Sequence, residues 1–152
     1  MSDLNLVDFC RDTAKVLVKL YGKFPQKIIL YVEDIAGPDS PDEFGLHCDR
    51  FIAGFHCLQW LAETDYIQYS QTIRQEAIED ATLTHRSFTF LSGPEHMNLS
   101  APEVCPPAQK QDIASPKLQR RIDTLSTALK TASSDHLTQL VLSYMEQTRQ
   151  FR

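Results

Sequence analysis

Two stretches carry most of the structural information in this chain: LQWLAETDYI at residues 58–67 and LTHRSFTFL at residues 83–91. The first predicts the end of an apolar-faced helix, a tight turn and the start of a strand. The second predicts the end of a return strand followed by a new helix, for which Thr84 is a suitable N-cap and which runs to about Ser92. The order helix, strand, strand, helix indicates a compact module with a small hairpin.

Working back from residue 58, the apolar periodicity predicts a central helix over residues 43–64. At about 100° per residue, one face gathers the apolar side chains of Phe44, Cys48, Phe51, Phe55, Leu58 and Ala62. The opposite face carries Asp49, Ala53, His56, Trp60 and Glu63. A tryptophan opposite the core face either packs under another element or stands exposed as an interface residue.

After this helix, residues 66–69 read as a strand, and residues 72–73 and 77–83, joined by a turn near residues 74–76, complete a β-wing. Residues 74–80 also have helix-friendly composition, so the sequence leaves open whether part of the wing is a helical turn.

The chain before the central helix begins with an amphipathic helix over residues 5–21. Arg11, Lys15, Lys19 and Lys23 recur at four-residue spacing on its polar face. This row is either a phosphate-contacting stripe or a solvated face on which Asp8 pairs with Arg11 and Asp12 with Lys15. Residues 27–32 are either a short strand or a short second helix, and residues 37–42 form a turn-rich loop.

The C-terminal third differs in composition. Five of the eight prolines fall between residues 93 and 116, which predicts a linker. Ser115-Pro116 is the cap-and-proline signature of a helix start, with an apolar stripe of Leu118, Ile122, Leu125 and Leu129. A further helix, capped by Ser133 or Ser134, follows. We expect a domain at 1–92, the linker at 93–116 and a helical segment at 117–150, which packs on the first domain or on a second copy.

The sequence offers no catalytic, cofactor or metal motif, and predicts a non-enzymatic protein. The two His-Cys pairs, His47-Cys48 and His56-Cys57, lie nine residues apart, which places them on opposite sides of a helix. The cysteines have no Cys-x-x-Cys spacing, and reduced thiols fit a chain able to build a core. The longest apolar run, residues 28–32, is too short to span a bilayer. A cytoplasmic protein without a membrane segment is expected.

The segment from 58 to 91, with its Leu58-x-x-Leu61, Tyr66-Ile67 and Leu83-Thr84 elements, resembles a winged helix-turn-helix domain. The resemblance covers about residues 5–92, and the layout is similar to small uncharacterised bacterial proteins with a winged-helix core and C-terminal helices. It implies a mainly α (α+β) fold: a winged-helix-like core, a small β-wing and C-terminal helices. It also implies that the helix before the wing could enter a DNA groove.

Charge argues against that DNA role. Residues 26–93 contain four basic and eleven acidic residues, whereas a protein that binds phosphates needs a basic footprint. We therefore expect a protein-interaction or regulatory adaptor, self-associating through its C-terminal helices, with Trp60, His56 and Asp49 at the partner interface. The alternative is a DNA-binding transcriptional regulator, whose nucleic-acid contacts would be Arg11, Lys15, Lys19, Arg50, Gln59 and Arg74.

Overall fold

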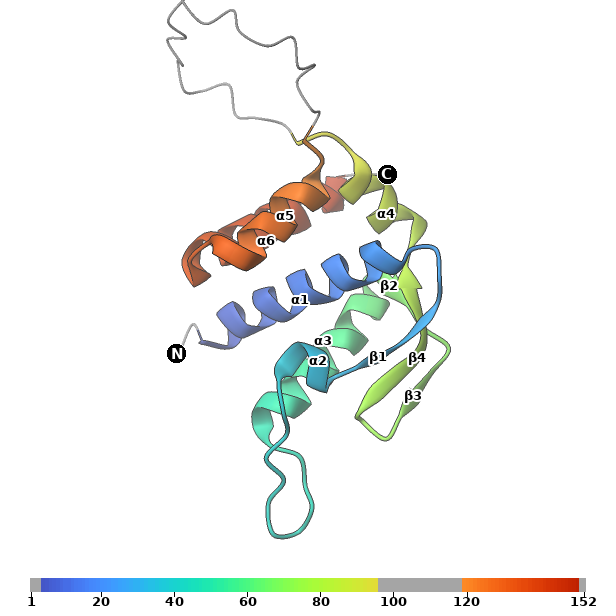
Figure 1. Ribbon diagram of the computed structural model, residues 1–152, viewed down its shortest axis with the longest axis vertical. Helices are drawn as coiled ribbons and strands as arrows, with labels where there is room; N and C mark the ends of the chain where they lie inside the picture. Colours follow the sequence, from blue (N-terminus) through green and yellow to red (C-terminus); the bar gives the residue numbers. More distant parts are fainter. Residues whose placement is uncertain (1–3, 96–118, 151–152) are drawn as a thin grey trace, which may run out of the picture.

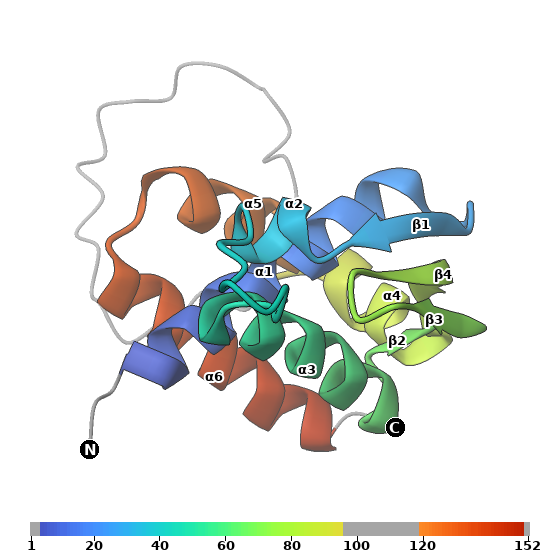
Figure 2. The ribbon, with the colours of Figure 1, turned by 90° about the horizontal axis from the view of Figure 1, so that it is seen from below.

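The computed structural model describes residues 4–95 and 119–150 of the 152-residue chain (Figure 1). These residues form a mainly α (α+β) fold, in which a small four-stranded antiparallel sheet lies at one side of the helices (Figures 1 and 2). No helix among them is long and apolar enough to cross a lipid bilayer.

Helix α1 (Leu4–Lys23) runs through the middle of the molecule, with α3 on one side and the C-terminal helices on another (Figures 1 and 2). Its apolar positions recur every three or four residues, so it buries side chains toward several neighbours at once. Cys10, Ala14, Val16, Leu17 and Leu20 all lie in the hydrophobic core. The amphipathic helix predicted from sequence is therefore confirmed, and extends slightly further at both ends.

After α1, the chain forms both elements between which the sequence left the choice open. Strand β1 (Ile28–Tyr31) comes first, and the short helix α2 (Glu33–Ala36) follows at once. Helix α2 packs against α3 so closely that a Cβ placed on Gly54 would lie 2.7 Å from the Cβ of Ala36. Only glycine allows this approach.

Helix α3 (Asp49–Glu63) begins six residues later than the predicted start at residue 43, and this part of the prediction is wrong. Phe44, which periodicity placed on the core face, lies in the preceding loop and is 84% exposed. The physical reason is local: the Asp42 carboxylate accepts hydrogen bonds from the backbone N–H groups of Phe44 and Leu46. Asx turns of this kind compete with helix formation. The later residues of the predicted face, from Phe51 onward, are buried.

The wing region contains three strands: β2 (Ile67–Gln68), β3 (Gln71–Ile73) and β4 (Ala77–Leu83). Strand β4 is the central one: it pairs with β1 on one side and with β2 and β3 on the other, all antiparallel. Arg74 and Gln75 have positive φ angles of 48° and 61° at the β3–β4 turn. Such angles do not continue a right-handed helix, so the strand reading of residues 77–80 holds over the helical one.

Helix α4 (His85–Ser92) begins at the expected cap, because the Thr84 hydroxyl accepts from the N–H of Ser87. Helix α5 (Arg121–Thr131) starts later than the Ser115-Pro116 signature predicts, since Gln119 and Arg120 are not helical. Instead Arg120 pairs with Pro94 in a β-bridge. The Ser115-Pro116 signature, Leu118 and most of the predicted linker, from residue 96 on, lie outside the described residues.

Helix α6 (Ser134–Gln150) follows the predicted break, and the Ser133 hydroxyl accepts from the N–H of His136. Both C-terminal helices pack against α1. Their apolar stripes, which include Leu125, Leu137, Val141 and Tyr144, join the same hydrophobic core as α1 and α3. The sequence left open whether these stripes pack on the first domain or on a second copy of the chain. In the structure they pack on α1 of the same chain.

Candidate functional site

An open groove runs between the first half of α1 and helix α3. It encloses about 790 Å³ and is lined by Asn5, Asp8, Phe9, Asp12, Asp49, Arg50, Ala53, His56, Cys57 and Trp60. The three residues predicted as a partner interface, Asp49, His56 and Trp60, all lie on its α3 wall. They line one wall because positions 49, 53, 56 and 60 repeat at three- and four-residue spacing along a helix.

Trp60 is half covered and half accessible. Its ring meets Phe9 of α1 edge-on, with centroids 5.2 Å apart, and stacks on Tyr66 at 6.2 Å. Even so, 40% of the residue remains exposed. Both sequence interpretations are therefore partly met: α1 covers one side of the ring and leaves the other open. A large aromatic ring held by two others loses little freedom when a partner binds it.

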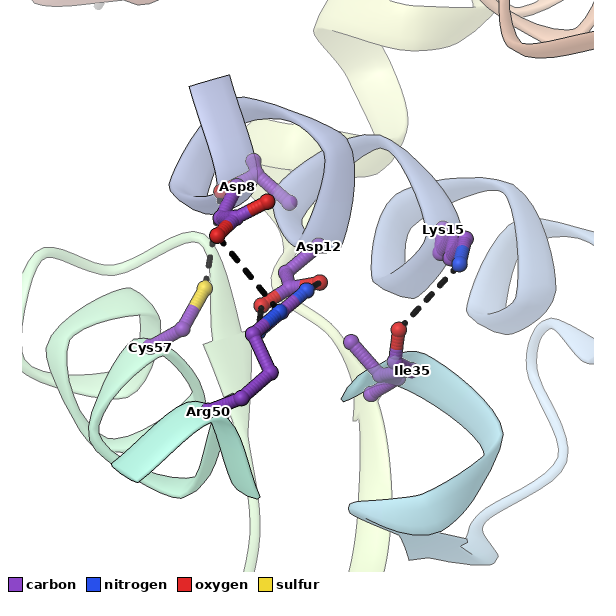
Figure 3. Close-up of polar contacts among 7 residues, drawn as sticks. Asp8, Asp12, Lys15, Ile35, Arg50 and Cys57 are labelled. Atoms are coloured by element: carbon purple, nitrogen blue, oxygen red, sulfur yellow. Dashed lines mark hydrogen bonds and ion pairs between the residues drawn. The ribbon is translucent and has the colours of Figure 1, made fainter. Parts of the chain in front are cut away.

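The floor of the groove holds an ion-pair network (Figure 3). The Arg50 guanidinium donates two hydrogen bonds to Asp12, at 2.8 and 2.6 Å, and its Nε lies 3.6 Å from Asp8. The Asp12 side chain is buried, whereas those of Arg50 and Asp8 are partly exposed. Burial raises the pKa of Asp12, and the Arg50 guanidinium offsets part of that rise. The hydrogen bonds to Asp12 in turn raise the pKa of Arg50.

Sequence reasoning missed this network. It paired Asp8 with Arg11 and Asp12 with Lys15 along one helix, whereas the structure pairs both aspartates with Arg50 of α3. Arg11 instead donates to the hydroxyl of Ser134 in α6, at 2.7 Å. The signal available in the sequence was the placement of two aspartates four residues apart on the first helix, close to its apolar stripe. Nothing local, however, identifies their partner.

Cys57 lines the groove, and Cys10 of α1 is buried in the core. Cys57 Sγ is 3.6 Å from the Thr13 hydroxyl, and burial raises the pKa of Cys57 to about 12. Burial also raises the pKa of Cys10 to about 11. Thiols with such values carry almost no thiolate at neutral pH and are poor nucleophiles. Cys10, Cys48 and Cys57 are free of disulfides.

The residues considered for nucleic-acid contact are not gathered on one surface. Arg11 faces α6, while Lys15 donates to the carbonyl of Ile35 and Lys19 pairs with Asp34, both in α2 (Figure 3 for Lys15). On α3, Arg50 is held by the two aspartates. The other two lie apart from this group: the Gln59 side-chain oxygen contacts Nδ1 of His56, and Arg74 is exposed at the β3–β4 turn. Three members of the α1 row, Arg11, Lys15 and Lys19, thus contact two different neighbouring helices, α6 and α2.

A second groove adjoins the first at Trp60. It encloses about 590 Å³ between the end of α3, α4 and α6, and is lined by Trp60, Thr64, Tyr66, Arg86, Leu142, Met145, Glu146 and Arg149. Trp60 therefore forms the ridge between an acidic groove and a groove with two arginines. Leu142, on α6, is 39% exposed there.

Within residues 4–95 and 119–150, no group of three His, Cys, Asp or Glu side chains is placed to hold a metal ion. What the first groove offers is carboxylates, one imidazole and a supported aromatic ring. Comparison of the chain with protein-family models, with curated proteins and with solved structures found no match.

Proposed function

We propose that this chain is a non-enzymatic, cytoplasmic winged-helix protein, which acts as a protein-interaction or regulatory adaptor and self-associates. The strand order, with β4 between β1 and the β2–β3 wing, supports the winged-helix proposal. One observation carries the functional part: Asp49, His56 and Trp60 line a single open groove. The hot spots of protein interfaces are enriched in tryptophan, so a half-exposed and well-supported Trp60 supports this role.

The charges of the groove favour a cationic partner. Asp8, Asp12 and Asp49 supply three carboxylates, and Arg50 is the single arginine or lysine among the lining residues. A partner segment with Lys or Arg next to an apolar residue would place its cation against Asp49 and its apolar side chain, or the cation itself, on Trp60. A DNA backbone would meet these same carboxylates and be repelled.

A peptide selection tests the proposal. Random peptides displayed on phage are selected against the full chain, and the enriched ones are titrated while the fluorescence of Trp60, the only tryptophan, is recorded. We expect enriched peptides to contain Lys or Arg beside apolar residues and to change this fluorescence. Asp49→Lys should weaken them about tenfold or more. Glu33→Lys is the matched control, because Glu33 occupies the first turn of α2 as Asp49 does of α3.

Two outcomes would contradict the proposal. One is enrichment of acidic peptides, or binding that Asp49→Lys leaves unchanged. The other is binding of random duplex DNA at low salt, with affinity that falls steeply as salt rises and that Arg50→Ala and Arg74→Ala both weaken. In the second case the transcriptional-regulator alternative would replace the adaptor role.

A further inference from the structure

The two most exposed large hydrophobic side chains among the described residues lie together on one loop. Phe44 is 84% exposed and Leu46 is 63% exposed, in the segment between α2 and α3. This segment, residues 37–48, extends away from the helices at one end of the molecule (Figure 1). We refer to Phe44, Gly45 and Leu46 as the tip. Exposed apolar surface that gathers in one place is a feature of interaction sites.

The tip is held by hydrogen bonds within its own loop. Asp42 accepts from the N–H groups of Phe44 and Leu46, and its own N–H donates to the carbonyl of Leu46 at 3.0 Å. Gly45, with φ of 75°, occupies a conformation that favours glycine. The loop therefore presents both side chains outward in a set geometry, which lowers the entropic cost of binding.

The base of the loop is fixed as well. Asp39 accepts from the N–H of Cys48 at 2.9 Å and bonds the ring of His47, which stacks on Phe51 with centroids 4.7 Å apart. These hydrogen bonds lower the pKa of Asp39 against the opposing effect of desolvation. The loop is thus attached to the start of α3 as a unit.

Charge narrows the class of partner. Residues 33–46 contain five acidic residues and no lysine or arginine. Such a surface is repelled by nucleic acid and by anionic lipid headgroups. A partner that matches the tip therefore has an apolar recess for Phe44 and Leu46, with cations at its border for the acidic residues.

The second groove of this same chain has that chemistry. Its apolar wall is formed by Trp60, Tyr66, Leu142 and Met145, and Arg86 and Arg149 lie along it. Glu146 is also present and pairs with Arg149 at 3.8 Å, which leaves the groove with one net positive charge. The Arg86 side chain donates to the carbonyl of Thr148, while its buried Nε has no acceptor among the described residues.

We propose that the tip of one copy binds the second groove of another copy. Phe44 and Leu46 would cover Trp60 and Leu142, while Glu43 would face Arg149 and Asp42 would face Arg86. The loop and the C-terminal end of α6 lie far apart in Figure 1, so a tip does not reach the groove of its own chain. Two reciprocal contacts related by a two-fold axis would close a dimer. The inference rests on the self-association part of the proposed function and names its surface.

Sedimentation of the full chain from about 1 μM to about 300 μM tests it, since weak interfaces dissociate in this range. We expect a monomer–dimer equilibrium that Phe44→Ser/Leu46→Ser weakens at least about tenfold. Ile73→Ser, which removes an exposed isoleucine from β3, is the control and should not alter it. Thermal unfolding of each variant checks that the fold is kept, which is expected because these side chains contribute little to the core.

A charge exchange gives a second, sharper test. Glu43→Arg and Arg149→Glu should each dissociate their own dimer, because the tip and the groove then carry like charges. An equal mixture of the two variants should form a mixed dimer as stable as the wild type, since both of its contacts pair opposite charges. Recovery on mixing depends on direct contact between the two positions and would not arise from a general loss of stability.

Several results would overturn the inference. These are a wild type that stays monomeric throughout, a dimer that survives Phe44→Ser/Leu46→Ser, and no recovery on mixing. Sedimentation of the chain with phosphatidylcholine vesicles, lost in the double variant, would assign the tip to lipid instead. Peptide binding at Asp49 is measured separately, so the adaptor groove can stand when the dimer contact fails, and the reverse also holds.

Discussion

Helix α1 has two very different sides. Toward α5 and α6 it is closed: apolar side chains meet, and the internal space lined by Leu17, Leu125 and Val141 amounts to about 20 Å³, enough for about one water molecule. Toward α3 it is open, with a groove of about 790 Å³ over an ion-pair network. The same helix is thus sealed by hydrophobic contact on one side, whereas its first half borders an open, charged groove on the other.

The closed side of α1 contributes mainly to stability, and the open side offers groups for recognition. The closed side removes apolar surface from water, which stabilises the fold without specifying a partner. On the open side, carboxylates, Arg50 and Trp60 stay within reach of another molecule. Substitutions on the closed side should therefore mainly lower stability. Substitutions on the open side should alter stability less and should change its pH dependence or the binding of partners.

The largest expected effect is on the closed side. Leu125→Ala should lower the free energy of unfolding by about 4 kcal/mol, because it enlarges an internal space that the surrounding helices cannot fill. Leu125 is fully buried. Leu6→Ala on α1 is the matched control and should cost less than about 1 kcal/mol, because that leucine is 42% exposed. Urea unfolding measures both, and equal losses would show that the C-terminal helices do not seal α1.

Next in size is Arg50→Met, which leaves the buried Asp12 carboxylate without its partner. We expect a loss of about 3 kcal/mol at neutral pH. Lys19→Met, which removes an exposed pair with Asp34, should change stability by less than about 0.5 kcal/mol. If Asp12→Asn in the Arg50→Met background fails to restore stability, the uncompensated carboxylate is not the cause.

The Arg50→Met loss should also depend on pH. Burial raises the pKa of Asp12 in the folded state, so the folded chain binds this proton more tightly than the unfolded chain does. The resulting stabilisation is complete below the unfolded pKa of about 3.9 and is lost as pH rises through the raised folded pKa. Without the offsetting guanidinium that pKa should rise further. The deficit of Arg50→Met relative to wild type should therefore shrink on mild acidification, and a constant deficit would contradict the network.

Trp60→Ala tests the ridge between the two grooves and should have a smaller effect on stability. Its contacts with Phe9 and Tyr66 are aromatic and partly exposed, so we expect the free energy of unfolding to fall by about 1 kcal/mol. Urea unfolding monitored by circular dichroism measures this change. Binding of selected peptides should fall much more than stability does. A loss as large as that of Leu125→Ala would place Trp60 with the core rather than with the open side.

The smallest effect concerns thiol chemistry and involves no change in stability. Cys10 and Cys57 have raised pKa values because they are buried, whereas Cys48 is only partly covered, at the start of α3. Iodoacetamide at neutral pH should therefore modify Cys48 before either of the others. Peptide mass spectrometry gives the order, and early modification of Cys57 would mean that the floor of the groove opens.

Patterns with a short range were predictable. The Thr84 cap, the break before Ser134 and the wing strands all follow from residues within a few positions of each other, and the structure confirms them. The α3 face with Asp49, His56 and Trp60 was also predictable, because helical periodicity alone places these residues together. The predicted start at residue 43 was wrong, because hydrogen bonds to the Asp42 carboxylate override the helix-like pattern there.

The amino-acid sequence by itself determined the mainly α class, the order of elements and the residues on the outer face of α3, because periodicity, caps and turns act over one or two helical turns. Only the tertiary structure decided which side of α1 is closed, that Asp12 pairs with Arg50 across 38 positions, and that Phe44 stands in solvent. Contacts between distant positions depend on how whole helices pack, and no local pattern of residues encodes that choice.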